Sequence, residues 1–290
     1  MRYFFAEKFP KKEMLGLKKT ILTLIAAAVL FTAASAGAMC EAQSAVTVYV
    51  DGERVDTAGL SYIENGATYV PVREICRALG ATRTEWTGSE SVIEAEGLGM
   101  RIAPGELYFT ANGRCVYTEH GCLLRSGRLM AHVRPLCAAF GADVEWNGAE
   151  KAVYIKTGGD PIQPGDEFYD DNDLYWLSRI IQAEAGGESL EGKIAVGNVV
   201  LNRVESPLFP NRVYDVIFDK KYGVQFTPAY SGGLKESPSD EAVAAAKLAL
   251  EGVNTAQGSL YFVAARAAAS SWAGRNREFV SQIGNHCFYA

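Results

Sequence analysis

The stretch that decides the fold of the C-terminal half reads Asp173-Leu-Tyr-Trp-Leu-Ser-Arg-Ile-Ile-Gln-Ala-Glu184-Ala-Gly-Gly-Glu188, and it continues after Ser189 as Leu190-Glu-Gly-Lys-Ile-Ala-Val-Gly-Asn-Val-Val-Leu-Asn-Arg-Val204. This pattern predicts a helix, a break at Gly186-Gly187 and a second helix. Asp173 and Ser189 are the expected N-caps. Leu174, Leu177, Ile181 and Glu184 recur at the helical spacing of three and four, so a carboxylate continues an apolar stripe.

Glu184 is therefore the first candidate for chemistry. Partial burial raises the pKa of a glutamate, which lets the side chain donate a proton near neutral pH. The two glycines that follow leave open space beside it. The alternative is a glutamate in a frayed last turn that points into water.

The rest of the C-terminal part, residues 173–290, is predicted to be mainly helical. A third helix is expected from Asp240 to Glu251, opened by Ser237-Pro238 or Ser239 and closed by Gly252. A short helix is expected within 210–218, and aromatic edge strands at 260–263 and 285–290. In the second helix the small residues Ala195 and Gly197 let another helix approach closely. Asn198 and Asn202 are expected to be structural.

Residues 46–157 contain an internal repeat. Gly52, Val72, Arg73, Cys76 and Gly80 recur 61 positions later, and Glu85-Trp86 returns as Glu145-Trp146. The repeat predicts a duplicated module of short strands around one helix per copy. Residues 158–172 are rich in Gly, Pro and acids, and they are predicted to be a solvated linker. The fold class is therefore α+β in two domains.

Residues 1–38 have the pattern of a secretory signal peptide. A basic lead precedes the apolar run 21–34, and small residues of cleavage type follow it. An uncleaved N-terminal anchor is the alternative. Lipid attachment at Cys40 is not expected, because Met39 stands where a small residue is required. The protein is thus expected to be secreted.

The remaining chain is acidic and aromatic. The signal carries six of the 28 basic and two of the 34 acidic residues, so the mature net charge is about −10. This charge argues against a nucleic-acid partner. The 14 Tyr, 13 Phe and 4 Trp residues instead suit a neutral or sugar-like ligand, whose apolar faces stack on aromatic rings.

Six cysteines and three dispersed histidines give no zinc-like spacing, so neither a metal nor a cofactor is expected. Export permits disulfides, and a cross-strand bridge between Cys115 and Cys122 is feasible, although six cysteines allow 15 pairings. Cys76 and Cys137 are expected to pack as small hydrophobic side chains.

Residues 46–157 resemble the domain named after the N-terminal region of copper amine oxidases, a module found in exported bacterial proteins. The resemblance rests on Tyr69-Val-Pro-Val-Arg73, Ala78-Leu-Gly-Ala81 and Trp86, and it is looser in the second copy. It implies no copper here, because neither copy has a ligand cluster. The module is interpreted as a spacer or adhesion unit that engages a cell-wall or membrane-associated partner.

Residues 173–290 resemble the SleB-type cell wall hydrolases, which include the spore-cortex-lytic enzymes of germination. The matching segments include Ala183-Glu-Ala-Gly-Gly-Glu-Ser189, the helix from Glu191 to Val204, Gln225-Phe-Thr-Pro228 and Ile283-Gly-Asn-His-Cys-Phe-Tyr289. The resemblance implies a lysozyme-like, mainly α domain that cuts peptidoglycan glycan strands as a lytic transglycosylase. It places the catalytic glutamate on Glu184. The chain departs from the family at residues 261–272, where relatives continue an aromatic pair with Asn-Pro.

Glycosidases usually need two carboxylates, but Glu188 is expected to serve the start of the second helix rather than catalysis. A transglycosylase requires only one, because the 6-hydroxyl of the muramic sugar attacks its own anomeric carbon. The expected substrate-binding residues are Gln225, Phe226, Tyr261, Trp272, His286 and Tyr289; of these, His286 is expected to be a hydrogen-bonded structural residue rather than a base. The alternatives are a hydrolytic muramidase or glucosaminidase, an N-acetylmuramoyl amidase, or a non-catalytic wall-binding protein.

Overall fold

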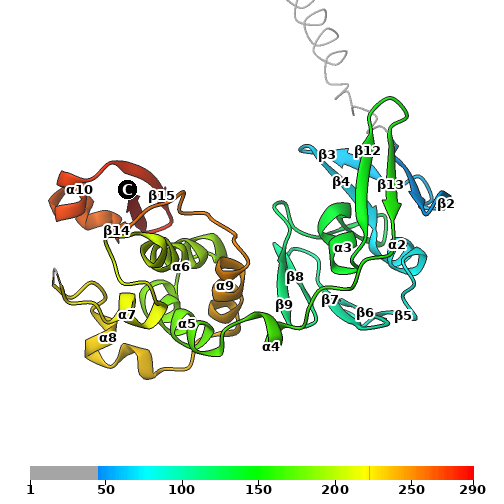
Figure 1. Ribbon diagram of the computed structural model, residues 1–290. Helices are drawn as coiled ribbons and strands as arrows, with labels where there is room; N and C mark the ends of the chain where they lie inside the picture. Colours follow the sequence, from blue (N-terminus) through cyan, green and yellow to red (C-terminus); the bar gives the residue numbers. More distant parts are fainter. Residues whose placement is uncertain (1–44, 222) are drawn as a thin grey trace, which may run out of the picture. The chain divides into compact units, whose positions relative to one another are not determined.

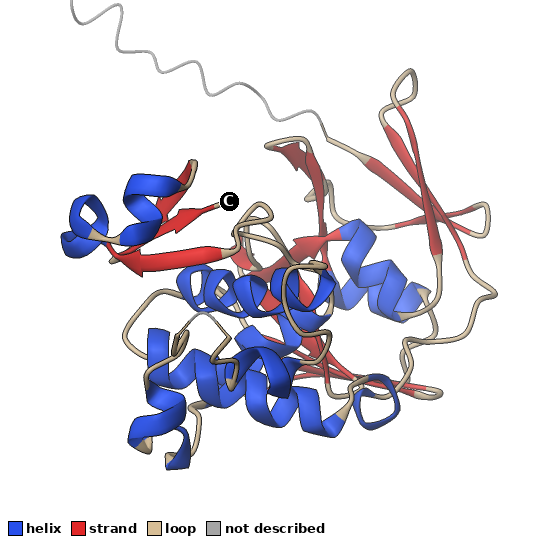
Figure 2. Cartoon of the chain, turned by 60° about the vertical axis from the view of Figure 1, so that its left-hand side comes forward, coloured by secondary structure: helices blue, strands red, loops and turns tan. Residues whose placement is uncertain are grey.

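The computed structural model describes residues 45–221 and 223–290 (Figure 1). The predicted signal peptide, residues 1–38, and Cys40 lie outside these residues. None of the helices in 45–221 or 223–290 combines the length and the apolar character needed to cross a bilayer. The described chain is mixed: residues 45–156 are rich in strands, and the part after residue 170 is mainly helical (Figure 2).

Three sheets and two short helices make up residues 45–156. One sheet has the order β12 (Asp143–Asn147), β13 (Ala152–Lys156), β1 (Thr47–Val50) and β2 (Glu53–Val55); a second has the order β10 (Leu123–Arg125), β11 (Arg128–His132), β4 (Ala67–Pro71) and β3 (Tyr62–Glu64). The third runs in chain order through β5 (Arg83–Trp86), β6 (Ser91–Ala95), β7 (Leu98–Ile102), β8 (Tyr108–Ala111) and β9 (Arg114–Tyr117). Because β1 pairs in parallel with β13, the first and last strands of the module lie side by side.

The helices α2 (Val72–Ala78) and α3 (Val133–Ala139) supply the module's core. Each buries its first valine and its cysteine, so Cys76 and Cys137 are fully buried in one apolar cluster, as predicted. The Cys115–Cys122 bridge that the sequence left open is not formed, because both are free, buried thiols. Cys115 packs in the apolar cluster of the helical part and Cys122 in that of the module, so their side chains serve different cores.

The segment 158–172, predicted to be a solvated linker, is mostly exposed, but it is also hydrogen-bonded to the module. Ile162 N–H donates to Ala139 O at 3.1 Å, and Gly165 N–H donates to Asn112 O at 2.8 Å. Gly165 begins the short helix α4 (Gly165–Phe168), and a Cβ at Gly165 would lie 2.9 Å from Gly113 O. The Gly and Pro residues that predicted exposure therefore allow this segment to lie close against the module.

The C-terminal part is built on α5 (Asp171–Ala185), α6 (Leu190–Glu205) and α9 (Asp240–Leu250), which Figure 1 shows grouped together. Shorter elements surround them: α7 (Val213–Ile217), α8 (Pro228–Ser231), η1 (Gly233–Lys235), η2 (Ala265–Ser270) and α10 (Trp272–Asn276). A small antiparallel sheet has the order β14 (Tyr261–Ala264), β16 (His286–Tyr289) and β15 (Phe279–Ile283). Both predicted strands are present, but only β14 lies at an edge; β16 is the central strand, because it pairs with β14 on one side and with β15 on the other.

Helix capping follows the sequence with one correction. Ser189 and Ser239 cap α6 and α9 by accepting from Gly192 N–H and Ala242 N–H. The cap of α5 is Asp170 rather than Asp173, since Asp170 accepts from the backbone N–H groups of Asn172 and Asp173, each at 2.9 Å. The helix begins earlier because three acidic residues, Asp170, Asp171 and Asp173, are available for this role, and Asp170 has the extended backbone that a cap requires.

The three long helices meet at Gly197. A Cβ added there would lie 2.9 Å from Ile181 Cδ1 on α5 and 3.3 Å from Ala249 Cβ on α9, so the absent side chain sets the spacing of both neighbours. Asn198 holds the loop after α9 by donating to Val253 O and accepting from Thr255 N–H. The structural roles predicted for this helix face are confirmed.

The hairpin of β8 and β9 packs against α9. Cys115, with Leu107, Tyr108 and Tyr117, joins the apolar cluster of the helical part. Beside it, Arg114 Nε donates to Glu251 Oε1 at 2.8 Å, and both side chains of this ion pair are 14% exposed. The N-terminal module is therefore bonded to α9 and not only tethered by the chain.

Candidate active site

Glu184 lies in the last turn of α5 and is partly buried. Ile181 and Leu177, one and two turns earlier on the same face, are fully buried, as the predicted stripe requires. Burial raises the pKa of Glu184 to about 7, and no neighbouring charge contributes to the shift. Among the residues that the structure describes, no side chain forms an ion pair with this carboxyl. Glu184 is thus half protonated near neutral pH.

The end of α5 is held in place beside Glu184. Gln182 Oε1 accepts from Ser239 N–H at 3.0 Å, which ties the last turn of α5 to the start of α9. The Gln182 side chain folds over Gly186, where a Cβ would lie 2.7 Å from Gln182 Nε2. A Cβ at Gly187 would meet no atom within 4 Å. Gly186 is therefore closely packed, whereas the space beside Gly187 is open.

Glu188, the nearest carboxylate in sequence, has a different environment. It accepts from the backbone N–H and the side-chain Nδ2 of Asn285, each at 3.0 Å, and these bonds lower its pKa. His286 Nδ1 lies 4.0 Å from Glu188 Oε1. A carboxylate held in this way stays ionised and is a poor proton donor.

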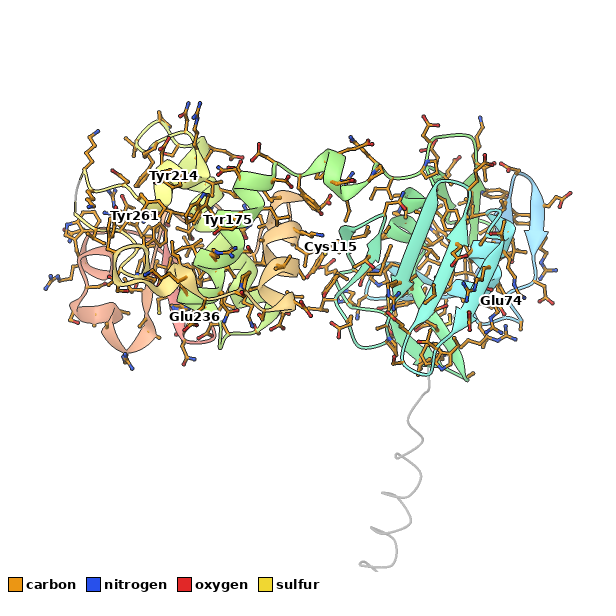
Figure 3. All side chains as sticks on the ribbon, turned by 90° about the horizontal axis from the view of Figure 1, so that it is seen from below. Glu74, Cys115, Tyr175, Tyr214, Glu236 and Tyr261 are labelled. Carbon is orange, nitrogen blue, oxygen red and sulfur yellow. The ribbon has the colours of Figure 1, made fainter. Side chains whose placement is uncertain are left out.

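A pocket of about 730 Å³ collects three of the predicted binding residues. Gln225, Tyr261 and Trp272 line it together with Pro207, Leu208, Phe209, Lys221 and Arg277. Tyr261, labelled in Figure 3, comes from β14, and its ring lies 5.6 Å from that of Trp272 at an angle of 61°. Trp272 is 55% exposed, so its ring is available to a ligand. Glu184 is not among the residues that line this pocket.

The other predicted binding residues belong to the interior, which corrects the expectation that they present stacking faces. Phe226 is 1% exposed and packs on Phe262, and Tyr289 is buried beside Phe279. His286 contacts the Phe262 ring edge-on, burial lowers its pKa, and its Nδ1 has no hydrogen-bond partner. The expected hydrogen bond of His286 is therefore absent at Nδ1. His286 and Tyr289 belong to β16, and Phe226 packs on Phe262 of β14, the strand that pairs with β16.

Sequence reasoning missed the cationic character of the pocket. Arg277 lines it, and Arg203, 4% exposed, lies beneath it with its guanidinium 4.9 Å from the Phe209 ring centre and 5.5 Å from that of Tyr261. Arg203 lies on a buried face of α6, next to Asn202 in the sequence. The periodicity of apolar residues along the helix does not predict that a cation is buried there. Arg277 and Lys221 sit in loops, where a single sequence gives no signal of their convergence.

A metal site requires a cluster of ligands, and the structure has none with three or more His, Cys, Asp or Glu side chains within 45–221 and 223–290. Of the predicted site residues, Gln225, Tyr261 and Trp272 line one pocket, and Glu184 lies in the last turn of α5, outside that lining. They come from α5, the loop before α8, β14 and α10.

Comparison with protein families separates the chain into two matches. Residues 187–289 match the family described as Cell Wall Hydrolase, and residues 49–155 match the Copper amine oxidase N-terminal domain. The C-terminal part of the chain is a cell wall hydrolase domain. Glu184 lies three residues before the matched range, whereas Glu188 and the pocket lie within it. The second match runs as one unit through the range of the predicted repeat.

Curated relatives include two spore cortex-lytic enzymes. That of Oceanobacillus iheyensis is 36% identical over 132 residues, which cover 46% of each chain. That of Bacillus subtilis is 35% identical over 120 residues, which cover 41% of this chain and 38% of the relative. The alignments thus span less than half the length of these relatives.

One solved structure with similarity to the hydrolase domain is described as the catalytic domain of the germination-specific lytic transglycosylase SleB from Bacillus anthracis. It is 31% identical to this chain, and the alignment covers 44% of this chain and all of that one, with a TM-score of 0.39.

Proposed function

We propose that the protein is an exported lytic transglycosylase that cleaves peptidoglycan between N-acetylmuramic acid and N-acetylglucosamine. The observation that carries the proposal is Glu184, a partly buried carboxyl with a pKa of about 7 at the glycine break where a cell wall hydrolase domain begins. The relatives named as spore cortex-lytic enzymes support peptidoglycan as the substrate class, in cell wall or spore cortex.

Glu184 serves as acid and then as base. The protonated carboxyl donates its proton to the glycosidic oxygen while the bond from that oxygen to C1 of the muramic sugar breaks, and N-acetylglucosamine leaves with its 4-hydroxyl restored. The 6-hydroxyl of the muramic sugar then attacks C1, and Glu184 takes its proton. The product is a 1,6-anhydro ring, the carboxyl is regenerated, and no water is consumed.

The single carboxyl fits this chemistry better than hydrolysis. A hydrolase needs a second carboxylate to activate water or to form a covalent intermediate. Both oxygens of Glu188 accept hydrogen bonds from Asn285, and this side chain stabilises the turn before β16. Under the proposal, Glu188 has a structural role at the turn before β16, and Glu184 performs both proton transfers.

The pocket supplies binding. Tyr261 and Trp272 present rings to the apolar faces of sugars, and Gln225 donates or accepts a hydrogen bond at an acetamido or hydroxyl group. Gln225 Nε2 donates at 3.2 Å to Gly223 O, which leaves the amide oxygen for a ligand. Sugar recognition by two rings and one amide suits a neutral glycan backbone.

The decisive experiment is digestion of purified peptidoglycan, followed by mass spectrometry of the muropeptides. Anhydro-muramic ends are expected. Free reducing ends would assign a hydrolytic muramidase or glucosaminidase instead, and released stem peptides with intact glycan would assign an N-acetylmuramoyl amidase.

Glu184→Gln distinguishes the enzyme from a wall-binding protein. The enzyme loses at least about 100-fold in lysis while its sedimentation with insoluble wall is unchanged. A non-catalytic binder releases no muropeptides in either form, and it sediments with the wall in both.

The domain boundaries along the chain follow from the same proposal. We infer a signal peptide at 1–38, a duplicated copper amine oxidase N-terminal-like module at 46–157, a connector at 158–172 and a lysozyme-like catalytic domain at 173–290. The helices α2 and α3 support the duplication, since each follows a strand and is succeeded by a glycine with positive φ, Gly80 or Gly141. The module engages the cell wall or a membrane-associated partner.

A further inference from the structure

The pocket that holds Tyr261 and Trp272 carries more positive charge than a neutral sugar requires. Arg277 lines it, and no Asp or Glu is among its lining residues. The Arg277 guanidinium lies 4.9 Å from the Tyr261 ring centre and 5.0 Å from that of Trp272, and one of its nitrogens donates to Tyr261 Oη at 3.2 Å. The side chain is therefore held at the aromatic wall while it remains exposed.

A second cation lies directly behind this wall. Arg203 Nε donates to Leu260 O at 2.7 Å, but its buried Nη1 has no hydrogen-bond partner. Burial lowers its pKa only to about 10, so the group is charged at neutral pH. Asp219 favours the charged form from a distance, yet no carboxylate in the described residues forms an ion pair with Arg203.

An uncompensated cation in a partly dehydrated setting acts strongly on a nearby anion, because the local dielectric constant is low. The rings of Phe209 and Tyr261 separate Arg203 from the pocket. Arg203 therefore raises the electrostatic potential in the pocket without contacting the ligand. Arg277 is placed to make the contact itself. Together, Arg203 and Arg277 make the pocket positively charged, although the chain as a whole is acidic.

We propose that this pocket is a subsite for a muramic residue that carries an anionic stem peptide, with the sugar on Tyr261 and Trp272 and a peptide carboxylate on Arg277. The inference rests on the proposed function and adds to it a preference for peptide-bearing over peptide-free glycan. Arg277 lies just after α10, in the region that follows the departure from the family pattern at 261–272.

The test uses the Glu184→Gln protein, so that binding is measured without cleavage. Its affinity is determined for soluble glycan strands that carry stem peptides and for the same strands after an amidase has removed them. Peptide-bearing strands are expected to bind about tenfold tighter at low salt, and the difference shrinks as salt rises. Equal affinity for the two strands would overturn the inference.

Three further changes in that background identify the contact. Arg277→Gln reduces the preference by about threefold to tenfold, and Arg277→Lys retains most of it. Arg275→Gln removes an exposed charge from α10 outside the pocket and leaves the preference unchanged. Tyr261→Phe removes the hydrogen bond to Arg277 but keeps the charge, and it also preserves the preference. If Arg277→Gln lowers the affinity for peptide-bearing and stripped strands equally, Arg277 only supports the rings of Tyr261 and Trp272.

The two proposals fail separately. If the native protein releases no anhydro-muramic ends, the proposed function fails, while the affinity ratio still decides the subsite. If anhydro ends appear but peptide-bearing and stripped strands bind alike, the transglycosylase stands and the subsite does not.

Discussion

Glu188 and Asn285, 97 positions apart in the sequence, are joined by two hydrogen bonds, which together are called the clasp. Each carboxylate oxygen of Glu188 accepts one hydrogen bond, from the backbone N–H or from Nδ2 of Asn285, at 3.0 Å. Gly284 makes the approach possible, because it has φ of +53° and a Cβ there would lie 2.0 Å from Glu188 Oε2. The clasp fixes the turn between β15 and β16 against the residue pair that precedes α6.

Glu188→Gln should therefore weaken the fold rather than the chemistry. The amide loses one acceptor and the negative charge, so we expect the free energy of unfolding to fall by about 1–2 kcal/mol at pH 7. The hydrogen bonds hold the pKa of Glu188 low, so this contribution is present above the unfolded pKa and is lost as pH falls through the folded one. Urea titrations at pH 7 and pH 3 measure the difference.

Glu236→Gln is the control for that change, since Glu236 is exposed and makes no contact of this kind. It should alter stability by less than about 0.5 kcal/mol. Full stability of Glu188→Gln together with loss of lysis would instead make Glu188 a catalytic partner, and the single-carboxyl mechanism would be wrong.

The pH dependence of lysis should report Glu184. The free enzyme must hold the proton that it donates, and the pKa of Glu184 is about 7. We expect kcat/KM to be level on the acid side and to fall about tenfold for each pH unit above 7. Initial rates on soluble glycan strands between pH 5 and pH 9 test this, and a rate that stays level up to pH 9 would exclude Glu184 as the acid.

The same burial carries a stability cost that can be measured independently. The pKa of Glu184 is raised above its value of 4.5 in the unfolded chain, so the native state binds more protons between pH 4.5 and 7, and stability falls as pH rises through this window. Glu184→Gln removes the penalty. It should exceed the native protein in stability by about 2–3 kcal/mol more at pH 8 than at pH 4, as measured by denaturant titration. An identical pH dependence for both proteins would show that the carboxyl is solvated.

Local rules predicted much of the helical domain. The hydroxyls of Ser189 and Ser239, the glycine break and the spacing of Leu177, Ile181 and Glu184 act within one or two turns, so a single sequence reveals them. The cap of α5 was misplaced only because Asp170 and Asp173 are chemically equivalent candidates. Neighbouring residues decide such features, and no tertiary contact is needed to predict them.

The pocket was only partly predictable, because tertiary packing decides which aromatic side chain faces inward. Phe226 and Trp272 are both large rings in loop-rich segments, yet one is 1% exposed and the other 55%. Arg203 is buried against residues up to 58 positions away, and Cys115 packs in the helical core although its strand belongs to the module. No local pattern carries these pairings.

The ion pair between Arg114 and Glu251 should couple the module to the hydrolase domain. Tyr169 Oη also donates to Glu251 at 2.6 Å, and Lys247 Nζ donates to Gly113 O at 2.6 Å. Because the pair is mostly buried, Glu251→Gln leaves Arg114 without its partner, and we expect a loss of about 2–3 kcal/mol. A double-mutant cycle with Arg114→Met isolates the pairwise energy. Additive effects would mean that the two side chains do not interact in solution.

Gly197 provides the sharpest test of how the helices position Glu184. Gly197→Val places atoms within about 3 Å of Ile181 and Ala249, and overpacking of this kind costs about 1–3 kcal/mol. Ile181 is one turn before Glu184 on α5, so a shift of its side chain also displaces the carboxyl, and lysis should fall more than the folded fraction accounts for. Gly99→Val is the control, because a Cβ at Gly99 would meet no atom within 4 Å. Calorimetry and muropeptide release, measured on the same samples, separate the two effects; a stable Gly197→Val protein with full activity would show that α5 and α6 do not meet at this glycine.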